Sequence, residues 1–224
     1  MKKIVRSALL IAILSVTAAG ICRAQAAFLT DANGQVLVEN KYVNIQGSPY
    51  LDEAWKNGAL TTATNRSYDK LKIRFDTYAG ELEYLQNGQT YRLNPENVKE
   101  FRIADGNELV FRNGFAATGS NTPNTFYQVL VDGPTKLLKQ YKVNLMESKA
   151  YNSATGNREF QKQDWYFVAK PDGSVQRIQK TKKSVLAAFP EQKDRVEKLM
   201  KEKDISLNEE SGLSALVTAV NGLQ

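Results

Sequence analysis

Seven turn dipeptides divide most of this chain into short segments. Each is Asn-Gly or Asp-Gly, a pair that accepts the positive φ angles of tight hairpin turns at little steric cost. We expect about half of them to mark hairpins or strand ends and the others to fill loops. They begin at Asn33, Asn57, Asn87, Asp105, Asn113, Asp132 and Asp172. Such frequent chain reversal favours antiparallel strands over βαβ units.

The segments between these turns have the composition of strands. Many are rich in Val, Tyr, Phe and Thr, which fit a pleated sheet. We expect a mainly β (α+β) fold with an antiparallel meander of roughly ten short strands, in a barrel-like or strongly curved sheet. The strand candidates are 37–46, 59–64, 70–75, 81–84, 89–93, 98–103, 108–112, 126–131, 135–145, 159–169 and 174–178.

One hairpin can be predicted in more detail. Apolar residues alternate with basic ones over 70–75 and with glutamates over 81–84. Residues 76–80 suit a hairpin loop, and a register that pairs Arg74 with Glu81 makes one face apolar and the other a ladder of opposite charges. We interpret the charged face as solvated, because exposed ion pairs contribute at most about 1 kcal/mol each.

The pattern changes from strand to helix spacing near residue 180. Apolar residues then recur three and four positions apart, at 185–189, 196–200 and 213–220. We expect two or three short amphipathic helices packed on the sheet, because isolated helices of this length are marginal in water. No linker rich in Gly, Ser or Pro separates the β region (27–179) from the helical segment (180–224), so one domain is the simpler interpretation.

The first 26 residues have the three parts of a secretory signal peptide. Lys2, Lys3 and Arg6 form a basic start, residues 7–22 are mostly apolar, and Ala24–Ala26 offers a small-x-small cleavage site. We therefore expect cleavage after residue 26 and export to the periplasm or beyond.

Two alternatives to cleavage concern membrane attachment. An uncleaved anchor would need about 20 apolar residues, and this run is shorter. A lipoprotein would be modified at Cys22, but Ile21 stands where lipoproteins have a small residue. We expect neither, and no later stretch approaches the length of a transmembrane helix.

The composition excludes several kinds of chemistry. The chain has no His, and its one Cys, Cys22, would leave with the signal peptide. Ser-His-Asp triads, Cys-His dyads and His-ligated zinc are therefore impossible, and we predict neither a cofactor nor a metal site. The net charge of +6 comes largely from the signal, since cleavage leaves 26 basic and 24 acidic residues. With no recognisable motif either, nucleic-acid binding is not expected.

One candidate binding site lies in the connection 47–55. Tyr50, Asp52 and Trp55 place aromatic rings beside a carboxylate, a combination that suits carbohydrate stacking or contact with a partner. The alternative is that Tyr50 and Trp55 are structural and plug one end of the sheet.

A second candidate is a basic cluster at the start of the helical segment. Lys180, Lys182 and Lys183 are candidates for contact with an anionic lipid surface or an acidic partner. The alternative is a solvated helix start.

Two long polar loops, 113–125 and 152–157, could form a lid or rim around a site. The alternative for both is a plain surface loop.

These observations favour a non-enzymatic exported protein of a Gram-negative envelope, which binds a protein partner or holds an apolar or glycan ligand on a curved sheet. One alternative is a hydrolase of glycans, which needs two carboxylates across a cleft. Its candidates are Asp52, Glu53, Glu81 and Glu83. The other alternative is an envelope-assembly component whose basic helices contact anionic lipid.

Three parts of the chain carry a diffuse resemblance to known sequences. They are the motif VNIQGSPYL at 43–51, the strand and turn through Phe75, and the helical tail from Lys182. Together they resemble exported, β-rich bacterial proteins of unknown function. The resemblance spans most of the mature chain and implies export and a β-rich fold only, with no assigned activity or site residues.

Overall fold

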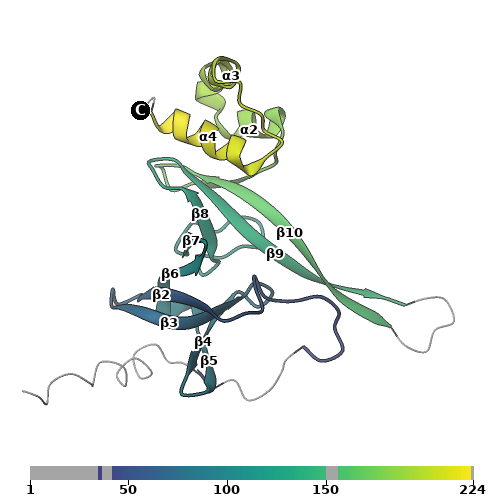
Figure 1. Ribbon diagram of the computed structural model, residues 1–224. Coiled ribbons are helices and arrows are strands. Elements are labelled where there is room, and N and C mark those ends of the chain that lie inside the picture. The colour runs from purple at the N-terminus through teal and green to yellow at the C-terminus, as the bar shows by residue number, and fades with distance from the viewer. Residues whose placement is uncertain (1–34, 37–41, 150–155, 223–224) are drawn as a thin grey trace, which may run out of the picture. The chain divides into compact units, whose positions relative to one another are not determined.

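The computed structural model describes residues 35–36, 42–149 and 156–222. Within them, eleven strands form one antiparallel sheet in the order β1-β5-β4-β3-β2-β6-β7-β8-β9-β10-β11 (Figure 1). The strands are β1 (Gln35–Val36), β2 (Lys56–Thr62), β3 (Ser67–Asp76), β4 (Glu81–Gln86), β5 (Gln89–Leu93), β6 (Val98–Asp105), β7 (Asn107–Arg112), β8 (Tyr127–Val131), β9 (Lys136–Ser148), β10 (Asn157–Ala169) and β11 (Val175–Ile178). The helices are α2 (Lys182–Ala188), α3 (Lys193–Glu202) and α4 (Glu210–Asn221), with 3-10 turns η1 (Pro95–Asn97) and η2 (Pro190–Gln192).

The mainly β, antiparallel fold with helices after residue 180 is confirmed. The barrel-like form of the prediction is wrong, because β1 and β11 stand at opposite ends of the strand order and no pairing joins them in the described part of the chain. The meander also has a break, since β6 pairs with β2 and not with β5, the strand before it.

Five of the six turn dipeptides in the described residues lie beside strand ends, more than the half that we expected. Those five begin at Asn87, Asp105, Asn113, Asp132 and Asp172. The pair Asn57-Gly58 is an exception, because it lies inside β2. Gly58 serves close packing there: a Cβ atom would lie 2.2 Å from Cδ1 of Ile73. The pair at Asn33 falls outside the described residues, as does part of the strand candidate 37–46.

Aromatic contacts show that the sheet curves strongly. The ring of Phe75 on β3 lies 5.4 Å from that of Phe111 on β7, centroid to centroid. Three strand spacings separate β3 from β7 in the sheet, which amounts to about 14 Å in a flat sheet. The rings of Phe101 and Phe126 join the same cluster, at 5.1 and 6.0 Å from Phe75. We call the face that carries these rings the concave face.

The register of the β3–β4 hairpin differs from the prediction by two residues. Arg74 lies opposite Glu83, and Asp76 lies opposite Glu81. The strand runs one residue further than expected because Asp76 Oδ1 accepts hydrogen bonds from the backbone N–H groups of the turn, including that of Tyr78 at 3.1 Å. A shift of two leaves every side chain on its predicted face, since side chains alternate with period 2.

All three helices share an apolar cluster with the last strands of the sheet. Its buried members include Leu137, Val168 and Ile178 from the strands and Val185, Val196 and Leu216 from the helices. None of the helices among the described residues has the length and apolar character needed to span a membrane.

The end of α4 is fixed to the start of β9 by one side chain. Asn221 Oδ1 accepts a hydrogen bond from Thr135 N–H at 2.9 Å, and Asn221 Nδ2 donates to Thr135 O at 2.8 Å. The amide thus takes the place of a neighbouring strand. We expect Asn221→Ala to lower the free energy of unfolding by about 1–3 kcal/mol, because it removes two hydrogen bonds to the backbone of Thr135. Urea unfolding of wild type and Asn221→Ala measures this difference. An unchanged midpoint would show that water replaces the two hydrogen bonds of Asn221.

Candidate functional site

Tyr50 and Trp55 enclose the guanidinium group of Arg74. Cζ of Arg74 lies 3.9 Å from the ring centre of Tyr50 and 4.5 Å from that of Trp55. The segment reaches this position because Leu51 N–H donates to Phe75 O at 2.9 Å, which continues the sheet beside the end of β3. Two of the three predicted binding residues are therefore brought together, around a cation.

The charged face of β3 and β4 is covered at Arg74 and Glu83, where its interpretation as a solvated ladder is wrong, while Lys72 on the same face is exposed. The side chain of Glu83 is 0 % exposed, and it accepts hydrogen bonds from Arg74 Nη2 at 2.7 Å and from Arg74 Nε at 3.1 Å. The hydroxyl of Tyr50 also donates to Glu83, at 3.4 Å. Burial, followed by the nearby charge of Glu83, raises the pKa of Tyr50 to about 12. The aromatic segment therefore buries an ion pair that the sequence pattern places at the surface.

A second tyrosine joins this segment to the far end of the sheet. Tyr42 donates a hydrogen bond of 2.5 Å to Oδ2 of Asp76, which is fully buried. Burial and this hydrogen bond raise the pKa of Tyr42 far above its usual range. Its ring packs edge-on against Phe160 of β10, at 5.3 Å, and against Tyr78 at 5.9 Å. Residues 42–55 thus bridge the β3–β4 hairpin and β10.

Three of the four carboxylates proposed for a hydrolase, Asp52, Glu81 and Glu83, are held in separate ion pairs. Asp52 lies 2.9 Å from Lys56, and a hydrogen bond from the N–H of Ala54, followed by that of Lys56, lowers its pKa. Glu81 lies 3.3 Å from Arg92, and Glu53 is exposed. A general acid needs a raised pKa, which is the opposite of what Asp52 has.

Two other carboxylates converge on one lysine, a grouping that the sequence analysis missed. Lys139 Nζ lies 2.9 Å from Asp164 and 2.8 Å from Glu210, and the hydroxyl of Tyr166 donates to Glu210 at 3.0 Å. Burial alone would lower the pKa of Lys139, but these hydrogen bonds outweigh it and raise the pKa. Because its members come from β9, β10 and α4, the cluster joins the helical segment to the sheet.

The three candidate lysines lie around the start of α2. Lys182 pairs with Glu197 of α3 at 2.5 Å, and Lys180 Nζ lies 6.0 Å from the ring centre of Tyr166. Lys183 is exposed. One of the three charges is therefore balanced by a neighbouring carboxylate, which reduces the positive field of the cluster.

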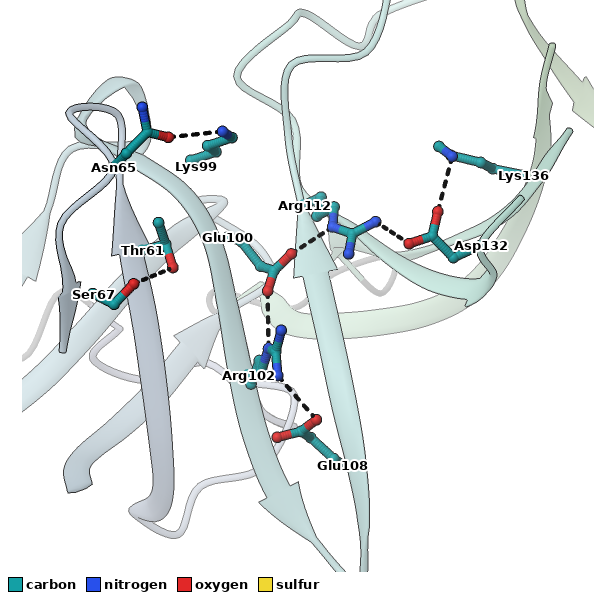
Figure 2. A network of polar contacts seen from close by, with 10 residues as sticks. All are labelled: Thr61, Asn65, Ser67, Lys99, Glu100, Arg102, Glu108, Arg112, Asp132 and Lys136. Carbon is teal, nitrogen blue, oxygen red and sulfur yellow. Dashed lines mark hydrogen bonds and ion pairs between the residues drawn. The ribbon is translucent and has the colours of Figure 1, made fainter. Parts of the chain in front are cut away.

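The face of β6 and β7 opposite the aromatic cluster carries a continuous network of ion pairs (Figure 2). Glu100 accepts hydrogen bonds from Arg102 and Arg112, and Arg112 also bonds to Asp132. Lys136 Nζ lies 2.8 Å from Asp132, which ends a chain of alternating charges. Because cations and anions balance along this chain, we interpret it as structural.

The ion pairs of Glu100 should make the stability of the protein depend on pH. Burial opposes the ionisation of Glu100, but hydrogen bonds from Arg112 and Arg102 outweigh it and lower its pKa from the ordinary 4.5. Its contribution to stability is therefore complete above the unfolded-state pKa and is lost as the pH falls through the folded-state pKa. We expect the difference in urea midpoint between wild type and Glu100→Gln to be largest at neutral pH and to shrink below about pH 4.5. A difference that stays constant with pH would contradict this account.

The loop 113–125 is fixed to the sheet at several points, among them Asn113 and Asn121, and borders an open hollow. Asn121 and Gln140 exchange two side-chain hydrogen bonds, at 2.8 and 3.1 Å, and Asn121 also donates to Tyr127. The later half of the loop, with the turn 77–80 and the middle of β9, lines a hollow of about 250 Å³. This part of the loop therefore lies at the border of the hollow. Most of the other loop, 152–157, falls outside the described residues.

The hydrogen bonds of β10 show in which direction the backbone N–H and C=O groups of β9 point. Gln46 N–H donates to Arg158 O at 2.8 Å, and Phe160 N–H donates to Gln46 O at 2.9 Å. The backbone N–H and C=O groups of the even-numbered residues in this part of β10 therefore point away from β9. The backbone groups of Glu159 therefore point toward β9, where Glu159 lies opposite Met146. Directly opposite residues of an antiparallel pair exchange both hydrogen bonds or neither. The residues of β9 whose backbone N–H and C=O groups point away from β10 are then Tyr141, Val143, Leu145 and Glu147.

This side of β9 has no neighbouring strand beyond its first residues. β8 pairs with β9 only as far as Gln128 opposite Lys139. Apart from β10 on the other side, no segment among the described residues forms a backbone hydrogen bond with 141–147. The open edge is about 20 Å long. Both long strands can be followed in Figure 1.

Three large apolar side chains are exposed among the described residues: Met146, 49 %, Tyr78, 41 %, and Val43, 61 %. Tyr78 lies near the open edge, because it lines a hollow together with Tyr141. Met146 is on β9 but on the face opposite Leu145, and Val43 belongs to the segment that bonds to the outer edge of β10. Sequence reasoning missed the approach of Tyr78 to β9 because the two are distant along the chain. The alternation of Tyr141, Val143 and Leu145 with polar residues predicts the strand but not which edge stays open.

Comparisons of this chain with protein-family models, with curated proteins and with solved structures found no match.

Proposed function

We propose that this protein is a non-enzymatic, exported envelope protein that binds a partner protein by adding an extended segment of the partner to the open edge of β9. The observation that carries the proposal is the outward row of backbone groups at residues 141–147, which no described segment pairs. Folded proteins usually cover, shorten or charge such an edge, because it is a template for another strand. Strand addition uses these groups for affinity and nearby side chains for specificity.

The side chains at the edge define the segment that fits. Tyr141, Val143 and Leu145 alternate with Lys142 and Asn144. Residues directly opposite one another in a sheet share a face. The added segment should therefore alternate apolar and polar residues, with the apolar ones on the same face as Val143.

The concave face favours a protein partner over an apolar ligand. Phe75, Phe101 and Phe111 fill it with contacting rings. The hollows beside them measure about 170 and 250 Å³. Pockets that enclose a drug-sized ligand measure about 300–1,000 Å³. A carrier of a long apolar molecule would need more room.

Proline substitution on the edge tests the proposal. Leu145→Pro removes one outward N–H group, and an edge strand tolerates proline when that group is unpaired. Leu145→Ala is the matched control, and Glu147→Pro is a second edge variant near the strand end. The tagged mature chains are used to capture proteins from an envelope extract, and each chain is first checked by thermal melting.

We expect a partner that wild type and Leu145→Ala retain and that both proline variants lose while they remain folded. Equal capture by the proline variants would show that the edge is not the binding surface. Absence of any retained partner would also count against the proposal.

A further inference from the structure

The hollow beside the open edge has an aromatic wall held in a fixed position. The ring of Tyr78 lines it. Phe160 supports that ring at 5.0 Å and Tyr42 at 5.9 Å, between ring centres. Tyr78 nevertheless remains 41 % exposed. A supported but exposed ring offers a flat apolar surface to a ligand at little entropic cost.

The loop lines the hollow with polar, uncharged residues. They are Ser120, Thr122 and Asn124, together with the buried amide pair of Asn121 and Gln140. No Asp or Glu occurs among the described residues that line the hollow, and its one cationic residue is Lys142. Hydroxyl and amide groups without carboxylates suit a neutral ligand that carries many hydroxyl groups.

We propose that this hollow binds one ring of a sugar, stacked on Tyr78 and hydrogen-bonded to the loop. A volume of about 250 Å³ admits a single ring and is small for a larger ligand. A flat apolar surface facing a few convergent polar groups is the usual arrangement of a small-molecule site. The hollow shares Tyr141 and Lys142 with the partner-binding edge, but the proposed sugar contacts are made by Tyr78 and the loop, so the proposal does not depend on strand addition.

The test is an NMR titration of the mature protein with neutral sugars. The probes are the methyl glycosides of glucose, galactose and N-acetylglucosamine, together with a trisaccharide of each. We expect at least one probe to shift the backbone amides of 78–80 and of Thr122, Asn124 and Thr125, with a Kd on the order of 1 mM for a single ring.

Four variants locate the binding. Tyr78→Ala should weaken it at least about tenfold, while Tyr78→Phe keeps the ring and should stay within about twofold. Ser120→Trp fills the hollow from an exposed position without removing a core contact, and it should abolish the shifts. Lys142→Gln should leave the affinity for neutral sugars unchanged.

Several outcomes would overturn the proposal. One is the absence of shifts for every probe at about ten times the expected Kd. Another is a set of shifts away from the hollow, or shifts that survive in a folded Ser120→Trp chain. Shifts produced by strand-forming peptides but by no sugar would assign the hollow to the partner-binding edge instead.

Discussion

Replacing Arg74 with Met should lower the free energy of unfolding by about 3–5 kcal/mol, because it leaves a buried carboxylate without its cation. Glu83 is 0 % exposed and receives two hydrogen bonds from this one side chain. The rings of Tyr50 and Trp55 also lose the group that they enclose. Urea unfolding of wild type and Arg74→Met measures the effect.

Two control variants separate the charge from the packing. Glu83→Leu should cost less than Arg74→Met, because Arg74 is 19 % exposed and can still reach water. The double variant should recover much of the loss, since an apolar pair can replace a buried ion pair at little cost. If Arg74→Met costs under about 1 kcal/mol, the pair behaves as a surface salt bridge and its burial is refuted.

The second large effect is expected at Phe101, in the centre of the concave face. Its ring is fully buried and stacks on Phe111 at 4.7 Å between ring centres, with Phe75 at 5.1 Å. Phe101→Ala should cost about 3–5 kcal/mol, from lost transfer energy and from the cavity that it leaves. Chemical unfolding monitored by circular dichroism gives the value.

A double-variant cycle tests whether curvature brings these rings together. Phe75 and Phe101 lie on strands that β2 separates, so in a flat sheet their rings would be about 10 Å apart. Contact predicts a coupling of at least about 0.5 kcal/mol between Phe75→Ala and Phe101→Ala. Additive losses would show that the two side chains act independently and that the sheet is flatter than described.

Local patterns predicted the elements well because they reflect local physics. The pair Asn87-Gly88 joins β4 to β5 with positive φ at both residues, as its chemistry requires. The helical spacing of Val196 and Leu199 likewise corresponds to buried positions on α3. Asn57-Gly58 was misinterpreted because the same small glycine serves either a turn or close packing. The sequence does not show that Ile73 will pack against Gly58, so it does not show which of the two roles the glycine has.

The charged face illustrates what sequence patterns leave open. Alternation correctly placed Arg74 and Glu83 on one face of the hairpin, but it does not say what covers that face. The covering residues, Tyr50 and Trp55, come from a segment whose pairing with β3 depends on a two-residue bridge and a few hydrogen bonds. The burial of this ion pair is therefore a property of the tertiary structure.

Neither the open edge nor the hollow can be predicted from the sequence. Both depend on where β8 stops pairing with β9, at Lys139. No residue type marks that point, because Tyr141, Val143 and Leu145 continue the same alternation beyond it. An edge is defined by the absence of a neighbour, so it becomes visible only when the whole strand order is known.

Hydrogen exchange of the free protein tests the open edge most directly. Along the far half of β9, the amides of Asn144 and Met146 should exchange slowly, because they point toward β10. The amides of Leu145 and Glu147 should exchange much faster, because they point outward. The account predicts this alternation of fast and slow amides in the monomer. Equal protection of all four would show that the edge is already covered and would contradict the proposed binding surface.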